Sequence, residues 1–263
     1  MKTIEYRLPS GGFIPGSPVA KMVTREYLVR EEKGLFSSNK PLIKLVSLIG
    51  DTAEYAEDVN GAELDPRQIV VQDFLYADFS HALTQLRNIS ISPEFDFNIP
   101  CSKCKTPAPF SVILTPEGLD TVYLEEEDKI EFSDELSFGV LTGRHMLVKN
   151  SLSLEPLLSK RRQSEGKDYD GGFSIRLASQ LVAVNDKKFL TTTDAERWLL
   201  DRTRSERSEI TRFLQENSFG DDMSLTLECD NCGHTEDVMV PITDKEFLFR
   251  EPRVENKRRR PDR

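Results

Sequence analysis

The stretches Cys101-Ser102-Lys103-Cys104 and Cys229-Asp230-Asn231-Cys232 decide the fold, because they hold all four cysteines of this 263-residue chain. A two-residue spacer lets two thiolates from one tight turn reach the same ion, and a second pair completes a tetrahedral shell. Such a shell is typical of a closed, structural zinc site. We therefore predict one structural Zn²⁺ ion bound by Cys101, Cys104, Cys229 and Cys232.

Strand-like sequence flanks each cysteine pair. Residues 94–99 and 110–114 surround the first pair, and residues 224–228 and 238–242 surround the second. These runs are rich in aromatic and β-branched residues, which favour strands. Each pair is therefore expected at the tip of two strands, as in a zinc ribbon.

Two alternatives to a shared zinc ion remain open. Each pair could hold its own metal, with His234 as a third ligand beside Cys232, although Lys105 and Thr106 follow Cys104 where a histidine would be needed. Two disulfides are the other possibility. The N-terminus lacks the layout of a signal peptide, so we expect a reducing compartment, where thiols favour metal over disulfide.

Charge and hydropathy restrict the partners. Acidic residues outnumber basic ones by 45 to 35, for a net charge of −10. Phosphate binding needs a basic surface, so a nucleic-acid partner is not expected for the molecule as a whole. No run of about 18 apolar residues occurs, so no membrane-spanning helix is expected.

Composition shifts suggest five segments. Residues 1–22 are rich in proline and glycine and are predicted to form an extended N-terminal arm. Residues 23–150 are predicted to form a first half that contains the first cysteine pair, or zinc knuckle. Residues 173–250 are predicted to form a second half that contains the second zinc knuckle. The polar stretch 151–172 is predicted as a linker or exposed loop, and 251–263 as a basic flexible tail.

Several helices are expected between these boundaries. Residues 41–49 are predominantly apolar, and Asp65-Pro66 is a helix-start signal before an amphipathic pattern over 67–88. Residues 173–184 are predicted as helix. Thr203 and Glu206 form a capping box that opens a helix reaching residue 217.

The two halves follow a similar order of helix, strand, cysteine pair and strand. One constant offset places Phe97 on Leu225 and Phe110 on Val238. Identity is low, so this is a weak internal repeat. The predicted fold class is α+β, with helices around a zinc-ribbon-like β element and two pseudo-repeated halves that share one four-cysteine zinc site.

Catalytic signatures are missing from the sequence. His81, His145 and His234 are scattered, and no H-E-x-x-H, G-x-S-x-G or phosphate-binding glycine loop occurs. A closed shell of four cysteines leaves no open position on the metal. We therefore expect neither an enzyme nor a small-molecule substrate.

Loose motifs also occur in a specific order along the chain. They are Leu8-Pro9-Ser10-Gly11-Gly12, Val29-Arg30-Glu31-Glu32-Lys33, Phe138-Gly139-Val140-Leu141-Thr142-Gly143-Arg144, Leu227-Glu228-Cys229-Asp230-Asn231-Cys232-Gly233, Val240-Pro241-Ile242 and Phe247-Leu248-Phe249. This order resembles the baseplate (hub) protein family of T-even-type contractile phages, and a zinc ribbon fits that family. The resemblance implies a structural or assembly role in the tail baseplate, hence in the virion after assembly in the host cytoplasm. Its partners would be other baseplate and tail proteins.

A zinc-ribbon adaptor in a nucleic-acid-handling complex is the alternative function. The basic run at residues 257–260 favours the adaptor. The acidic balance of the chain and the absence of interleaved aromatic and basic residues around the knuckles favour the baseplate role.

Overall fold

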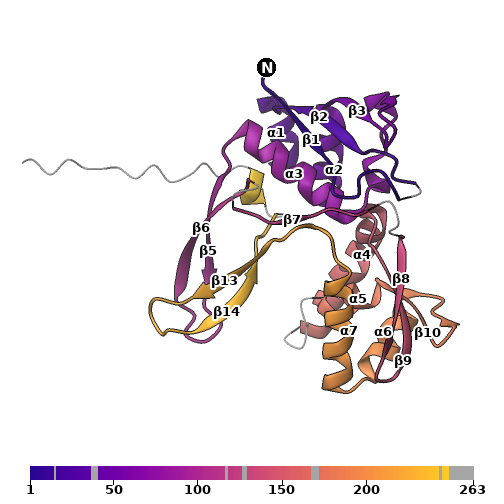
Figure 1. Ribbon diagram of the computed structural model, residues 1–263. Helices are drawn as coiled ribbons and strands as arrows, with labels where there is room; N and C mark the ends of the chain where they lie inside the picture. The colour runs from indigo at the N-terminus through magenta and orange to yellow at the C-terminus, as the bar shows by residue number, and fades with distance from the viewer. Residues whose placement is uncertain are drawn as a thin grey trace, which may run out of the picture.

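The computed structural model describes residues 1–14, 16–36, 41–115, 118–125, 129–166, 172–242 and 245–248. Within these ranges the chain forms seven α-helices and five antiparallel sheets (Figure 1). The α+β class is therefore confirmed. No helix in these ranges is both long enough and apolar enough to span a lipid bilayer.

The N-terminal body is a four-stranded antiparallel sheet with helices packed on one face. The sheet follows the order β1–β2–β3–β4, and α2 and α3 lie against it. Its elements are β1 (Thr3–Arg7), β2 (Lys21–Arg25), α1 (Val29–Phe36), α2 (Pro41–Thr52), β3 (Ala53–Glu57), β4 (Glu63–Leu64), the short 3₁₀ turns η1 (Pro66–Gln68) and η2 (Val71–Asp73), and α3 (Tyr76–Ser90).

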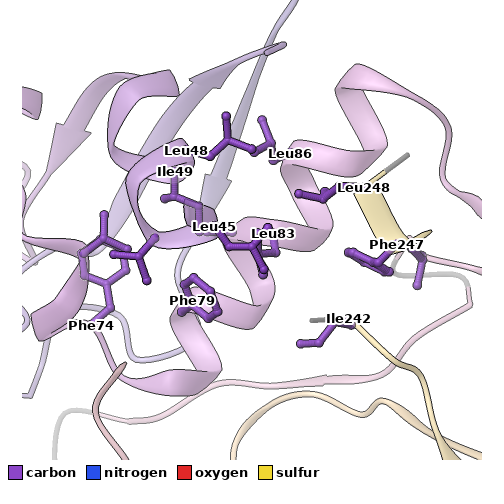
Figure 2. Packing of buried hydrophobic residues seen from close by; sticks show 14 of the residues in the cluster. Leu45, Leu48, Ile49, Phe74, Phe79, Leu83, Leu86, Ile242, Phe247 and Leu248 are labelled. Carbon is purple, nitrogen blue, oxygen red and sulfur yellow. The ribbon is translucent and has the colours of Figure 1, made fainter. Parts of the chain in front are cut away.

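The main hydrophobic core lies between α2 and α3 and extends to the end of the described chain (Figure 2). Ile242 and the short helix η4 (Lys245–Leu248) supply apolar side chains to it from more than a hundred residues away in sequence. Buried members of this core include Leu45, Leu48, Ile49, Phe74, Phe79, Leu83, Leu86, Ile242, Phe247 and Leu248 (Figure 2). The end of the chain therefore returns to the N-terminal body.

Two hairpins carry the cysteine pairs at their tips. The first is β5 (Glu94–Pro100) with β6 (Pro107–Ile113), and the second is β13 (Ser224–Glu228) with β14 (Thr235–Met239). Each hairpin alternates buried or half-buried side chains with exposed ones. The prediction of strands on both sides of each cysteine pair is confirmed.

A separate unit lies between the two hairpins in the chain, and we call it the insertion. It begins after β7 (Thr121–Val122) and ends at β12 (Gly220–Asp221), and these two strands pair with each other. The chain therefore leaves and re-enters the rest of the molecule at one neck. The insertion contains β8 (Glu131–Leu136), β9 (Gly139–Arg144), α4 (Val148–Glu165), α5 (Phe173–Ala178), β10 (Leu181–Val184), β11 (Lys187–Lys188), α6 (Thr192–Leu200) and α7 (Arg204–Glu216).

The insertion has its own sheet and its own core. Its strands follow the order β11–β10–β9–β8, and Leu141 of β9 is buried in one cluster with Leu199 of α6 and Phe213 of α7. The break expected at residue 150 therefore cuts through a single sheet, because β8 and β9 precede it and β10 and β11 follow it.

The N-terminal arm is not a separate extended segment over the residues described. Residues 3–7 and 21–25 are paired strands, and Leu8, Ile14 and Val19 between them are buried. Glycine and proline shape the loop that joins the strands, but these three apolar side chains hold it against the protein.

The predicted linker at 151–172 is wrong for residues 151–165, which form most of α4. Leu154 and Leu158, one helical turn apart, are buried against Ile175 of α5. Arg161 on the same helix pairs with the buried Glu196 of α6. These contacts stabilise a helix whose sequence is otherwise polar; residues 167–171, like the tail 251–263, lie outside the described residues.

Two helix predictions need correction at their boundaries. Residues 66–73 form two 3₁₀ turns before α3 starts at Tyr76, with Asp65 accepting a hydrogen bond from the Arg67 amide as the predicted cap. The helix expected over 173–184 stops at Ala178, and Leu181–Val184 pairs with β9 instead. Valine at two of these four positions favours the strand. The helix at 41–49 and the Thr203 capping box are confirmed.

Candidate metal centre

The two cysteine turns share one backbone conformation. In the first turn the Cys101 amide donates to the Thr106 carbonyl oxygen at 3.0 Å, and the Lys105 amide donates to the Cys101 carbonyl oxygen at 2.9 Å. In the second turn the matching bonds are Cys229 to His234 at 2.9 Å and Gly233 to Cys229 at 2.8 Å. Lys105 and Gly233 both adopt positive φ, of 61° and 63°. Each turn thus presents its two thiols from the same local scaffold.

The tips of the two hairpins bring all four sulfur atoms together. Their Sγ atoms lie within 4.8 Å of one another. The Cys101 and Cys232 sulfurs are 3.8 Å apart, and those of Cys104 and Cys229 are 3.6 Å apart. Four thiolates at about 2.3 Å from a tetrahedral Zn²⁺ ion would be about 3.8 Å from one another. The cluster therefore has the size that a four-thiolate metal site requires.

All four cysteines are free thiols, so the two-disulfide alternative does not describe this structure. Cys101 is fully buried and Cys229 is 2% exposed, whereas Cys104 and Cys232 are half-buried. Every sulfur faces the other three. This arrangement can hold a metal ion in a shell of four thiolates.

Hydrogen bonds favour the thiolate form of Cys104, the form that binds a cation. The side chain and the backbone of Thr106, followed by the Asn231 side chain, lower the pKa of the Cys104 thiol to about 5. For Cys232 the His234 amide favours the thiolate, but desolvation and the other three thiols outweigh it and raise the pKa to about 12. Four adjacent thiolates repel one another, so a divalent cation is needed to stabilise the fully ionised cluster.

None of the three histidines belongs to the sulfur cluster. His234 Nε2 lies 3.1 Å from the Ser102 side-chain oxygen, and His81 Nδ1 lies 2.8 Å from Asp221. The His145 ring packs against Phe132 and Phe219, each at 4.9 Å between ring centroids. This geometry favours one shared centre over a separate metal at each cysteine pair.

Four residues near the cluster were not anticipated from the sequence: Ser102, Thr106, Asn231 and Glu236. They make hydrogen bonds between the two hairpins. The hydrogen bond from the Ser102 amide also lowers the pKa of Glu236. Their residue types are common on any surface turn. The one available signal is that Thr106 and His234 each follow the first cysteine of their pair by the same number of positions.

A cleft of about 750 Å³ lies where the N-terminal body, the insertion and the second hairpin meet. Apolar side chains such as Leu158, Leu214, Phe219 and Met239 contribute to its lining. The neck beside it is held by Asp221, which accepts a hydrogen bond from the Thr121 hydroxyl at 2.8 Å.

Comparison with protein-family models, with curated proteins and with solved structures finds no match for this chain.

Proposed function

We propose that Cys101, Cys104, Cys229 and Cys232 bind one structural Zn²⁺ ion. The observation that carries this proposal is the meeting of four sulfurs from two hairpins, with Cys104 and Cys229 separated by 125 positions. Each hairpin supplies half of the shell, so the ion would cross-link the segments before and after the insertion. The closed shell suits a structural role.

The ion would contribute directly to folding, because its ligands meet only in the folded chain. Structural zinc sites have apparent binding free energies of about 10 kcal/mol or more at neutral pH. The net stability of a whole domain is of about the same size, roughly 5–15 kcal/mol. Loss of the ion would therefore weaken the contact between the two hairpins and the docking of the C-terminal segment.

The two turns also support an internal repeat. They share the same pair of backbone hydrogen bonds and the same position of positive φ. We infer that the first hairpin, which follows α3, and the second hairpin, which comes after α7 and β12, are the related parts of two pseudo-repeated halves. The insertion would be an addition between them.

We further propose that the chain is a structural or assembly component of a contractile-tailed phage baseplate, in the hub region. This proposal rests on the ordered motifs that resemble that family and on a centre suited to bracing rather than catalysis. Its partners would be other baseplate and tail proteins, and its place the virion. A body braced by metal at one end and by a buried core at the other suits a scaffold.

Metal content tests the zinc proposal. Elemental analysis of the purified chain should find one zinc per chain. The double change Cys229→Ser with Cys232→Ser should remove the metal and lower the melting temperature by at least ~10 °C, because loss of several kcal/mol lowers it by a few degrees per kcal/mol. Asp230→Asn, in the same turn but outside the sulfur cluster, should keep the metal. A parent protein without bound metal would refute the proposal.

The baseplate proposal has its own test. Tails isolated from cells that produce the tagged chain together with its phage should contain it, or the chain should crosslink to tail or baseplate proteins during assembly. Association with none of these proteins would contradict the proposal.

A zinc-ribbon adaptor in a nucleic-acid-handling complex is the second candidate, because of the basic residues at 257–260. Binding of fluorescent DNA and RNA would be measured over a salt titration. An affinity that falls steeply with salt would support the adaptor, because phosphate contacts release counterions. No measurable binding at low salt would exclude it.

A further inference from the structure

Three hydrogen bonds join the two hairpins beside the sulfur cluster. The Ser102 amide donates to Glu236 Oε1 at 2.7 Å. The Ser102 side-chain oxygen lies 3.1 Å from His234 Nε2, and Asn231 Nδ2 donates to the Thr106 hydroxyl oxygen at 3.2 Å. All three are formed between protein groups, so they hold the turns together independently of a metal.

Two of these contacts are reciprocal. Thr106 and His234 occupy equivalent places in the two turns, since each one accepts, through its carbonyl oxygen, the amide of the first cysteine. The side chain of each contacts a residue between the cysteines of the opposite turn, Asn231 or Ser102. The sulfur contacts follow a similar pattern, because the first cysteine of each pair lies within 4 Å of the second cysteine of the other, at 3.8 Å for Cys101 and Cys232 and 3.6 Å for Cys229 and Cys104. The backbone of the turns and the sulfur cluster are thus approximately two-fold, although the offset between the halves places Asn231 on Lys103 rather than on Ser102.

Glu236 breaks this local symmetry. The constant offset between the halves places Ala108 at the corresponding position of the first hairpin, and alanine has no hydrogen-bonding side chain. The Glu236 carboxylate therefore makes an additional, charge-assisted bond in one direction only. A bond of this kind is roughly twice as strong as one between neutral groups.

The acceptor is well placed to orient the first turn. The Ser102 amide lies between the two ligands Cys101 and Cys104, so a carboxylate fixed on β14 restricts rotation of the turn that carries both sulfurs. Protein groups around a metal site commonly orient its ligands in this way, and their loss weakens metal binding about 10- to 100-fold.

We propose that Glu236 is a positioning residue of the metal centre, which aligns Cys101 and Cys104 with the second hairpin before a metal binds. This inference rests on the proposed zinc function. Glu236 does not itself belong to the sulfur cluster. Its role is to lower the cost of assembling the four thiolates, because the first turn is already held in the geometry that the ion requires.

Zinc affinity is the first test, measured by competition between the full chain and a chromophoric chelator with Zn²⁺ as the only added metal. Glu236→Ala should still bind one zinc per chain but about 10-fold more weakly. Glu236→Gln keeps an acceptor oxygen and should recover most of the loss. Glu228→Ala is the matched control, because it removes the same charge from an exposed residue directly before Cys229. Equal losses for Glu236→Ala and Glu228→Ala would overturn the positioning role.

Amide exchange at Ser102 is a second test that needs no bound metal. In chelator-treated protein, NMR should show a protected Ser102 amide in the parent and in Glu228→Ala, and about 10-fold faster exchange in Glu236→Ala, since its acceptor is lost. An unchanged exchange rate would overturn the inference. A parent chain that binds no zinc would refute the zinc proposal instead, so the two failures are distinguishable.

Discussion

The guanidinium of Arg87 in α3 donates a hydrogen bond to the backbone carbonyl oxygen of Phe247, which lies 160 positions further along the chain. The same side chain donates to the Glu94 carbonyl oxygen at 2.7 Å and lies over the Phe95 ring at 4.7 Å. Arg87 is fully buried. One side chain thus joins α3, the first hairpin and the C-terminal segment, well away in sequence from the cysteine turns.

We predict that Arg87→Met destabilises the protein by about 3–5 kcal/mol. Methionine fills part of the volume but leaves the carbonyl oxygens of Glu94 and Phe247 without their buried donor. Arg87→Lys should recover little, because an ammonium group cannot reproduce the planar fork that reaches both carbonyls. The free energy of unfolding would be measured by urea titration of the full chain.

Arg67→Met is the control for this change, because the Arg67 side chain is 92% exposed. Its effect should stay within about 0.5 kcal/mol. If Arg87→Met costs no more than Arg67→Met, the guanidinium does not hold the C-terminal segment in place.

The equivalent positions Lys105 and Gly233 allow an exchange of residues between the two turns. Both have positive φ, but a left-handed conformation costs a lysine roughly 1–2 kcal/mol and a glycine almost nothing. Lys105→Gly should therefore stabilise the protein by about 0.5–1 kcal/mol, after the greater flexibility of glycine in the unfolded chain is counted. Gly233→Lys should destabilise it by about the same amount.

Both variants would be compared by thermal and urea unfolding of the zinc-saturated protein. A Cβ atom at Gly233 would have no heavy atom within 4 Å, so steric contact does not complicate this change. Effects of the same sign in the two variants would show that backbone strain does not explain the difference between the turns.

Local signals in the sequence predict the cysteine hairpins well. The flanking strands are confirmed, and the four cysteines meet as their spacing suggests. The capping box at Thr203 and Glu206 is also formed as expected. In each case the residues that decide the structure are neighbours in sequence, so a short pattern is sufficient.

Features that depend on distant partners could not be predicted in this way. The polar stretch that forms α4 is helical because Leu154, Leu158 and Arg161 meet α5 and α6, none of which its own sequence indicates. The glycine- and proline-rich start of the chain is held because Leu8 is buried in the main core and Ile14 is buried in a cluster with Leu75 and Leu124. Glu236 has its role only because the Ser102 amide comes within 2.7 Å.

The buried carboxyl group of Asp78 makes stability depend on pH. Asp78 Oδ1 accepts a hydrogen bond from the Ser10 amide at 2.8 Å, whereas Oδ2 is buried without a partner. Burial raises the pKa of Asp78 from 3.8 to about 6, although hydrogen bonds from the backbone and side chain of Ser10 and, more weakly, the nearby His81 act in the opposite direction. The folded state thus holds this proton more tightly than the unfolded chain does. The contribution of the Asp78 proton to the free energy of unfolding is therefore fully present below about pH 4. This contribution is lost as pH rises through about 6.

Asp78→Asn removes this titration while keeping an acceptor for the Ser10 amide. The variant should gain stability relative to the parent as pH rises from about 4 to about 7, by up to ~3 kcal/mol. Urea unfolding at several pH values would measure the difference. Asp201→Asn removes an exposed carboxylate after α6 and is the control for the loss of one negative charge. A constant difference for Asp78→Asn would contradict the prediction.

Gly220 at the neck of the insertion allows the close approach of β12 to α3. Its φ of +97° is a conformation that side chains rarely adopt, and a Cβ atom there would lie 2.8 Å from Cβ of Ala77. Gly220→Ala therefore combines backbone strain with a steric clash, and we expect it to destabilise the protein by about 2–4 kcal/mol.

Gly61→Ala separates the two effects, because Gly61 also has a positive φ, of +77°, but has open space around it. That control should cost only about 1 kcal/mol. If the two variants have equal free energies of unfolding, the contact between the neck and α3 does not add to the cost of a side chain at position 220.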